Sequence, residues 1–78
     1  MELDSSFIYK IYLKDISDQF LSGLDISYYS DIGGLYIIGI YFSRFIFDGE
    51  EGILINNRNR RIYFSNKNII QFVPIESI

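Results

Sequence analysis

Three carboxylates gather in one short predicted turn, residues 48–52, which read Asp-Gly-Glu-Glu-Gly. Carboxylate oxygens bind hard cations such as calcium, and they also attract basic protein surfaces. The spacing of Asp48, Glu50 and Glu51 does not match a calcium-binding EF-hand loop, and a solvated hairpin turn is the simplest interpretation. We therefore expect no metal site and no cofactor. We take these three residues, together with Asp25 and Asp31, as candidate acidic contacts to a protein partner.

Basic side chains gather a few residues later, at Arg58, Arg60 and Arg61, with Lys67 nearby. Asparagines are interleaved with them at positions 56, 57, 59, 66 and 68. Arg and Asn side chains read phosphates and base edges through paired hydrogen bonds, and Tyr63 or Phe64, if exposed, would stack on a base. A polar loop that keeps an apolar chain soluble and blunts edge pairing is the simpler interpretation. A solvated loop, a protein contact and a nucleic-acid contact all stay open.

Only residues 53–55 lie between the two charged turns. A strand advances about 3.3 Å per residue, so such a strand would separate the turns by roughly 10 Å. An acidic tip and a basic tip would then lie at opposite ends of one strand. Complementary tips favour head-to-tail assembly, or steer docking onto a charged partner.

Seven tyrosines are too many to bury comfortably in so small a domain, because each buried hydroxyl needs a hydrogen-bond partner. They occupy positions 9, 12, 28, 29, 36, 41 and 63. Tyr28 and Tyr29, with Asp25 and Asp31 around them, form the preferred aromatic contact patch. Side chains alternate along a strand, so one of these two tyrosines should point outward.

The chain contains no His and no Cys. It therefore lacks the usual general base near neutral pH, the most nucleophilic side chain, and the ligands of most zinc sites. No Gly-x-Ser-x-Gly turn and no phosphate-binding Gly-x-x-x-x-Gly-Lys loop occurs, and Gly33-Gly34 is not followed by a helix signal. We expect a protein that is not an enzyme.

Composition predicts a single domain over residues 1–78, with 49% hydrophobic and 18% aromatic residues. A chain this short buries only about 60% of its unfolded surface. It needs a dense aromatic core, or self-association into a homodimer or higher homo-oligomer. The net charge of −3 argues against a partner bound mainly through phosphates. Direct nucleic-acid binding is thus the lesser alternative, and a basic nucleic-acid-binding protein is a suitable partner.

The first six residues are acidic and polar, and they lack the charged-then-apolar order of a signal peptide. The longest uncharged run, residues 32–43, is shorter than the roughly 20 apolar residues that span a bilayer. We expect no membrane partner and a cytoplasmic location, in the host cytoplasm if the gene belongs to a phage. Frequent Ile, Asn, Lys, Tyr and Phe, which use AT-rich codons, favour an AT-rich bacterial, phage or plasmid gene.

Aromatic and β-branched residues favour strands at residues 7–13, 26–29, 35–47, 53–55, 61–65 and 69–73. Apolar residues also recur every four positions from Ile8 to Phe20, so a helix over the first of these segments is the alternative. Gly39 predicts a bulge or sharp bend in the longest strand. Pro74 predicts that the residues after it form an edge or a tail.

One short helix of about two turns is predicted between Lys14 and Leu24. Asp15 can act as its N-cap, Asp18 in the first turn suits the helix dipole, and Gly23 is a natural stop. Turns are predicted at residues 30–34, 48–52, 56–59 and 66–68.

These elements predict a mainly β fold: a small five- to six-stranded barrel or strongly bent antiparallel sheet, SH3-like or Sm-like, with one short helix. An α+β fold with an N-terminal helix on an antiparallel sheet is the alternative. Residues 18–24 resemble the N-terminal helix of Sm-like RNA-binding proteins, and Phe64 with residues 69–74 resembles their closing strands. The resemblance implies a small barrel. No His follows Lys67, where that family's second motif has one, so no functional residue is carried over.

The predicted function is that of a non-enzymatic protein-interaction module. It would be a small acidic inhibitor or modulator from a phage or mobile element, of the anti-CRISPR type, acting stoichiometrically. Its acidic residues would imitate phosphates on a nucleic-acid-binding surface. Two alternatives stay open. One is an Sm-like or SH3-like nucleic-acid-binding barrel that uses the basic turn, and the other is a structural subunit that forms oligomers.

Overall fold

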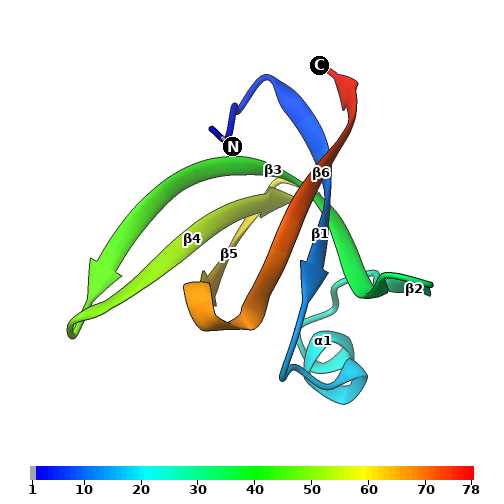
Figure 1. The fold of residues 1–78 in the computed structure, drawn as a ribbon. Helices are drawn as coiled ribbons and strands as arrows, with labels where there is room; N and C mark the ends of the chain where they lie inside the picture. The colour runs from blue at the N-terminus through cyan, green and yellow to red at the C-terminus, as the bar shows by residue number, and fades with distance from the viewer. Residues whose placement is uncertain (1) are drawn as a thin grey trace.

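Six strands and one short helix follow one another in residues 2–78, the part of the chain that this computed structural model describes (Figure 1). The strands are β1 (Phe7–Leu13), β2 (Tyr29–Asp31), β3 (Gly34–Phe47), β4 (Glu50–Asn57), β5 (Arg60–Ser65) and β6 (Ile69–Ser77). The helix α1 (Asp18–Gly23) lies between β1 and β2, and a single 3-10 turn, Asn66–Asn68, precedes β6.

All six strands belong to one antiparallel sheet in the order β5-β4-β3-β1-β6, with β2 paired to the start of β3. The predicted mainly β class with one short helix is confirmed. The helix considered over residues 7–13 is wrong, because β1 pairs with both β3 and β6. β5 and β6 are the edges of the sheet, and no hydrogen-bond ladder joins them within residues 2–78. The sheet is therefore not closed.

One face of the sheet carries the hydrophobic core. The residues of the core cluster recur at every second position in β1 and β4, because successive side chains of a strand point to opposite faces. Tyr9, Ile11 and Leu13 of β1 follow this pattern, as do Ile53 and Ile55 of β4. The cluster is completed by Leu21, Ile26, Ile37 and Phe64. The side chains on the other face of the sheet do not belong to this core cluster.

Two tight hairpins connect β3 to β4 and β4 to β5. Asp48 and Gly49 form the first loop, with φ of 53° and 80°, and Arg58 and Asn59 form the second, with φ of 51° and 63°. Two consecutive positive φ values identify type I′ turns, whose twist matches that of the flanking strands. Both loops are shorter than the predicted turns, so Glu50, Glu51, Asn56 and Asn57 lie within β4 instead.

The ends of α1 differ from the prediction. Ser17 is the N-cap, and its hydroxyl accepts a hydrogen bond from the Phe20 amide at 3.1 Å. Asp15 lies outside the helix, with φ of 58°. Gly23 lies inside the helix, and the left-handed residue after it is Asp25, also with φ of 58°. Asp tolerates this conformation better than most side chains, so the chain reverses without using the glycine.

Gly39 marks a close approach of two strands, and the predicted bulge lies elsewhere. The β3–β4 register shifts between Tyr41 and Ser43, which makes Phe42 the extra residue. A Cβ at Gly39 would lie 2.6 Å from the Ile55 side chain and 3.0 Å from the Asn56 carbonyl oxygen. Glycine is required here because β4 crosses directly over its α-carbon.

Two strand boundaries are also corrected. The strand predicted at residues 26–29 begins only at Tyr29, and Ile26 instead contributes to the core. The last strand continues beyond Val73 to Ser77, through Pro74. Because β6 is an edge strand, the missing N–H of Pro74 leaves no partner unsatisfied on its open side. None of the helices in residues 2–78 has the length and apolar character needed to cross a membrane.

Candidate functional site

The acidic and basic turns lie at opposite ends of β4, as predicted, since the β3–β4 hairpin precedes this strand and the β4–β5 hairpin follows it (Figure 1). The contacts made at the two ends differ.

The carboxylates of β4 are paired within the chain. Glu51 accepts a hydrogen bond from the Arg44 guanidinium at 2.8 Å and another from the Asn66 amide at 3.2 Å. Glu50 pairs with Lys67 at 3.1 Å. The Glu51 carboxylate raises the pKa of Arg44 through this hydrogen bond. These contacts tie the β3–β4 hairpin to the 3-10 turn. Among residues 2–78, no three carboxylates gather as metal ligands would.

Asp31 is also engaged inside the chain. It accepts hydrogen bonds from the Tyr12 hydroxyl at 2.7 Å, the Gly33 amide at 2.8 Å and the Lys10 ammonium at 3.3 Å. The Tyr12 hydroxyl is the main cause that lowers the pKa of Asp31. In return, hydrogen bonding to Asp31 raises the pKa of Tyr12 and of Lys10. The carboxylate fixes the β2–β3 turn against β1.

The basic residues have separate roles. The Arg60 guanidinium donates to the carbonyl oxygens of Leu24 and Asp25, at 2.8 and 2.7 Å, and so fastens the end of α1 to β5. The Arg61 guanidinium lies 4.0 Å from the centre of the Phe42 ring, a cation–π contact. Lys67 pairs with Glu50. Arg58 alone of the four basic candidates has no side-chain hydrogen bond, ion pair or cation–π contact to the described part of the chain.

Tyr28 and Tyr29 are both partly exposed, at 36% and 45%. The expected alternation of one inward and one outward ring is wrong, because Tyr28 precedes β2 and only Tyr29 belongs to it. The Tyr29 ring stacks on Tyr36 with centroids 5.5 Å apart, and Tyr36 contacts Tyr12 at 5.3 Å. Tyr29 is thus the outer end of a row of three rings, with Tyr36 in the middle and Tyr12 at the other end.

A larger group of exposed aromatic residues was not predicted as a site. We call it the aromatic surface. It comprises the exposed rings of Phe20, Phe42, Phe47 and Tyr63, the half-buried ring of Phe45 and the exposed side chain of Leu24. Phe47 is 76% exposed and Tyr63 is 66% exposed. Phe45 contacts Tyr63 edge-on at 5.3 Å, and both line one shallow hollow with Phe47. Tyr63 lines a second hollow with Phe20 and Leu24, so the group is continuous.

The sequence does contain a signal for part of this surface. Phe45 and Phe47 are two residues apart in a strand, so their side chains share a face. Their partners across β4 are Gly52 and Glu50, neither of which belongs to the core. High aromatic content led us to expect an aromatic core, which Tyr9 and Phe64 do contribute to, but Phe45 and Phe47 lie outside it.

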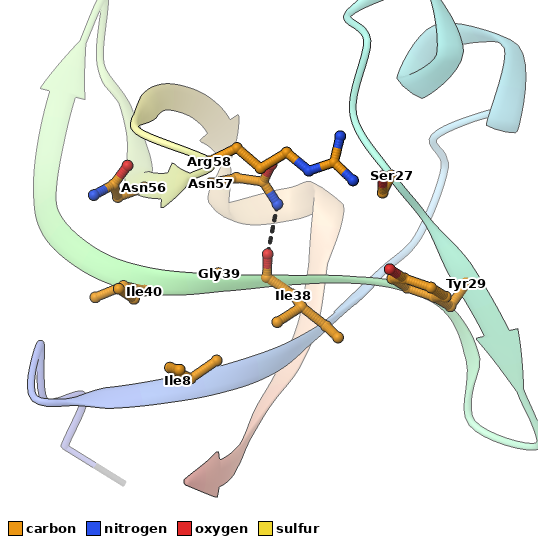
Figure 2. Close-up of a pocket in the computed structure, with 9 residues that line it drawn as sticks. All are labelled: Ile8, Ser27, Tyr29, Ile38, Gly39, Ile40, Asn56, Asn57 and Arg58. Atoms are coloured by element: carbon orange, nitrogen blue, oxygen red, sulfur yellow. Dashed lines mark hydrogen bonds between the residues drawn. The ribbon is translucent and has the colours of Figure 1, made fainter. Parts of the chain in front are cut away.

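A hollow of about 290 Å³ lies beside the β4–β5 hairpin (Figure 2). Its apolar wall consists of Ile8, Ile38, Gly39 and Ile40, and its polar side consists of Ser27, Tyr29, Asn56, Asn57 and Arg58. Only 7% of Asn57 is exposed, and its amide donates a hydrogen bond to the Ile38 carbonyl at 2.5 Å. The side-chain carbonyl oxygens of Asn56 and Asn57 are buried without a hydrogen-bond partner.

Comparison with known proteins does not assign the chain to a family. No protein family, curated protein or solved structure matches the chain.

Proposed function

We propose that the chain is a non-enzymatic protein-interaction domain, a stoichiometric inhibitor or modulator that contacts a partner protein through the aromatic surface. The observation that carries this proposal is the exposure of Phe42, Phe47 and Tyr63 on the side of the sheet opposite the core. Clusters of exposed aromatic side chains are uncommon on proteins that act alone, and they often mark interaction sites.

The composition of the surface suits an interface. Aromatic residues and Arg are enriched at the centres of protein interfaces, and polar groups surround them. Arg61, which lies over Phe42, supplies the cation, and Glu50 and Glu51 line the hollow beneath Phe45 and Phe47. Truncating one such aromatic anchor typically costs about 2 kcal/mol of binding, roughly a thirty-fold loss of affinity.

The acidic candidates support a secondary role in this interface. Glu50, Glu51 and Asp31 each pair with a basic side chain of the same chain. Imitating phosphates would require them to exchange these partners for those of the target. We assign Glu50 and Glu51 to the polar rim of the aromatic surface, and Asp48 to its outermost point.

We also propose that the sheet is an open variant of the SH3-like or Sm-like small barrel. Both edges of the sheet support this, since Phe64 of β5 belongs to the core cluster and Phe72 of β6 packs against it. A core shared by both edge strands is what a small barrel requires.

Capture from a lysate of an AT-rich bacterial host tests the protein-binding proposal. Wild-type chain is compared with the double variant F47S/Y63S and with the matched control I32S, since Ile32 is fully exposed away from the aromatic surface. We expect wild type and I32S to retain the same partner, identified by mass spectrometry. The double variant should retain at least ten-fold less of this partner.

Equal retention by all three proteins would overturn the proposal. Light scattering over a range of concentrations tests the rival occupant, a second copy of the chain. A dimer that F47S/Y63S abolishes would assign the aromatic surface to self-association instead of a partner.

A further inference from the structure

The two edges of the sheet differ in how well they resist the addition of another strand. Edge strands are commonly protected by proline and by β-bulges. β6 has both, because it contains Pro74 and its register against β1 shifts twice. β5 has neither, since its pairing with β4 is regular over all six of its residues and it contains no proline. β5 is therefore the edge that can accept a further strand.

The hairpin geometry identifies the free backbone groups of β5. A two-residue turn is closed by a hydrogen-bonded pair of residues, and hydrogen-bonded and open pairs then alternate along the two strands. The pair that closes the β4–β5 turn is Asn57 and Arg60. Arg61 and Tyr63 therefore direct both their N–H and their C=O groups away from β4, and Ser65 directs its N–H the same way. These groups form a regular row of donors and acceptors along the edge.

Two hollows lie between this edge and α1. One, of about 350 Å³, lies between the start of the helix and the end of β5, and the other, of about 320 Å³, lies between the end of the helix and the start of β5. Phe20 and Tyr63 line both, so the hollows form one groove, which we call the β5 groove. Each hollow is at the small end of ligand sites, which suits the side chains of one extended segment. The β5 strand of a second copy has its own α1 along the same edge and does not fit in this way.

The two ends of the β5 groove carry opposite charges. At the Ser65 end, Asp15 lines the groove, no Lys or Arg does, and Asp15 forms no ion pair within residues 2–78. At the other end, Arg60 and Arg61 line the groove and no Asp or Glu does. The middle is apolar and aromatic, at Phe20 and Tyr63. Opposite charges and apolar side chains on paired strands stabilise each other, so the groove is complementary to a segment with a basic end, an apolar middle and an acidic end.

We propose that β5 accepts an extended segment of the partner protein as an additional antiparallel strand, with its residues in the order basic, apolar, acidic. Antiparallel pairing is the more stable arrangement, and it places the first residues of the segment at the Ser65 end. Backbone hydrogen bonds supply affinity, and alternate side chains supply specificity. This inference rests on the proposed protein-binding function and adds the conformation and the chemistry of the partner.

Titration of the ¹⁵N-labelled chain with blocked pentapeptides tests the proposal. The probe is Lys-Val-Ile-Val-Glu, which at millimolar concentration should shift the backbone amide signals of Arg61, Tyr63 and Ser65. The charge-swapped peptide Glu-Val-Ile-Val-Lys should bind about five-fold more weakly, because it opposes like charges at both ends. The same probe with an N-methyl group on its isoleucine should bind roughly ten-fold more weakly, because it loses the donor to the Tyr63 carbonyl.

The variant S65P tests the edge from the side of the protein. Ser65 has φ of −67° and ψ of 142°, and its side chain caps nothing, so proline fits its backbone. The substitution replaces an outward N–H with a ring and leaves the ladder to β4 intact. S65P should keep the urea unfolding midpoint of the wild type and bind the probe roughly ten-fold more weakly. The N-methylated peptide makes the same test on the unaltered protein.

Four results would overturn the proposal: no shift by the probe, equal binding of the N-methylated or the charge-swapped peptide, unchanged binding in a folded S65P, or a dimer that S65P abolishes, which would assign the edge to a second copy. Capture from the lysate separates this proposal from the protein-binding function. A partner retained by S65P and I32S but lost by F47S/Y63S would leave the protein-binding function standing without the added strand. Loss of that partner in S65P as well supports strand addition.

Discussion

The two ends of β4 have the same type of turn but differ in how their polar side chains are paired. Each is a two-residue type I′ hairpin with charged or polar residues beside it. At the β3–β4 end, Glu50 and Glu51 pair with Lys67 and Arg44. At the β4–β5 end, Arg58 is unpaired within the described chain, and the oxygens of Asn56 and Asn57 are buried without donors.

This difference shows that charge density alone is a poor guide to a site. The acidic end is conspicuous in the sequence, yet most of its carboxylates already have partners. At the other end, Arg60 and Arg61 are also engaged within the chain, Arg60 by the carbonyls of Leu24 and Asp25 just after α1 and Arg61 by the Phe42 ring. What distinguishes it is unmet hydrogen-bonding capacity, in the buried side-chain oxygens of Asn56 and Asn57.

The largest expected effect comes from Gly39, beside the β4–β5 end, and Gly52, near the β3–β4 end, is the matched control. Gly39→Ala should destabilise the fold by about 2 kcal/mol or more, because its Cβ would meet the Ile55 side chain and the rigid Asn56 backbone. Gly52→Ala should cost less than about 1 kcal/mol, since its Cβ meets only the Phe45 ring, which can turn aside. Urea unfolding midpoints measure both. A larger loss for Gly52→Ala would show that the β3–β4 end is the more rigid.

The second loop positions give the next effect. Gly49 has φ of 80° and open space around it, so Gly49→Ala should cost about 1 kcal/mol from backbone conformation alone. Asn59 has φ of 63° in the equivalent position, so Asn59→Gly should change stability by less than about 1 kcal/mol, since Asn already tolerates this region. Thermal unfolding of both variants checks the pair. Equal losses of stability in Gly49→Ala and Asn59→Gly would contradict this prediction, because only the alanine is disfavoured at positive φ.

Arg58 gives a smaller effect with the opposite sign. Arg58→Asn should stabilise the fold by about 0.5 kcal/mol, because Asn adopts positive φ at the first loop position more readily than Arg. Chemical unfolding measures the gain, with Arg60→Asn as the control. Arg60→Asn should destabilise, since it removes two hydrogen bonds to α1. A destabilised Arg58→Asn variant would mean that Arg58 has a structural partner.

Much of the fold follows from local sequence. The strand at residues 7–13, the long strand to Phe47 and the order of the turns were predicted, because alternation and Asp-Gly pairs act over a few residues. The helix cap was misassigned because Asp15 and Ser17 are both good caps, and only tertiary packing of Leu21 decides between them.

The candidate site was less accessible to prediction. Arg58 and its neighbouring asparagines were named as a polar loop, but their hollow also needs Ile8, Ser27 and Tyr29, which come from distant segments. The unpartnered oxygens depend on atomic positions that no spacing encodes. Phe45 and Phe47 lie opposite Gly52 and Glu50, on the face away from the core, because the bulge at Phe42 shifts the register of the strand after it.

The smallest effect tests whether pairing, and not acidity, decides the role of a carboxylate. The pKa of Asp31 is lowered chiefly by the Tyr12 hydroxyl. Its contribution to stability is therefore present above its unfolded pKa, about 4, and is lost as pH falls through the lower folded pKa. The pKa values of Tyr12 and Lys10 are raised, so their contributions are present below about pH 10 and are lost as pH rises through the folded values.

Tyr12→Phe should move the pKa of Asp31 upward, because it removes the main hydrogen bond to the carboxylate while keeping the ring that contacts Tyr36. Carboxyl ¹³C titration of the wild type and the variant measures this shift. Asp31→Asn should flatten the acid limb of the stability curve, and its side-chain oxygen can still accept from the Gly33 amide. An Asp31 pKa that does not change in Tyr12→Phe would show that the hydroxyl is a neighbour and not a partner. The carboxylate would then belong with the acids available to a protein target.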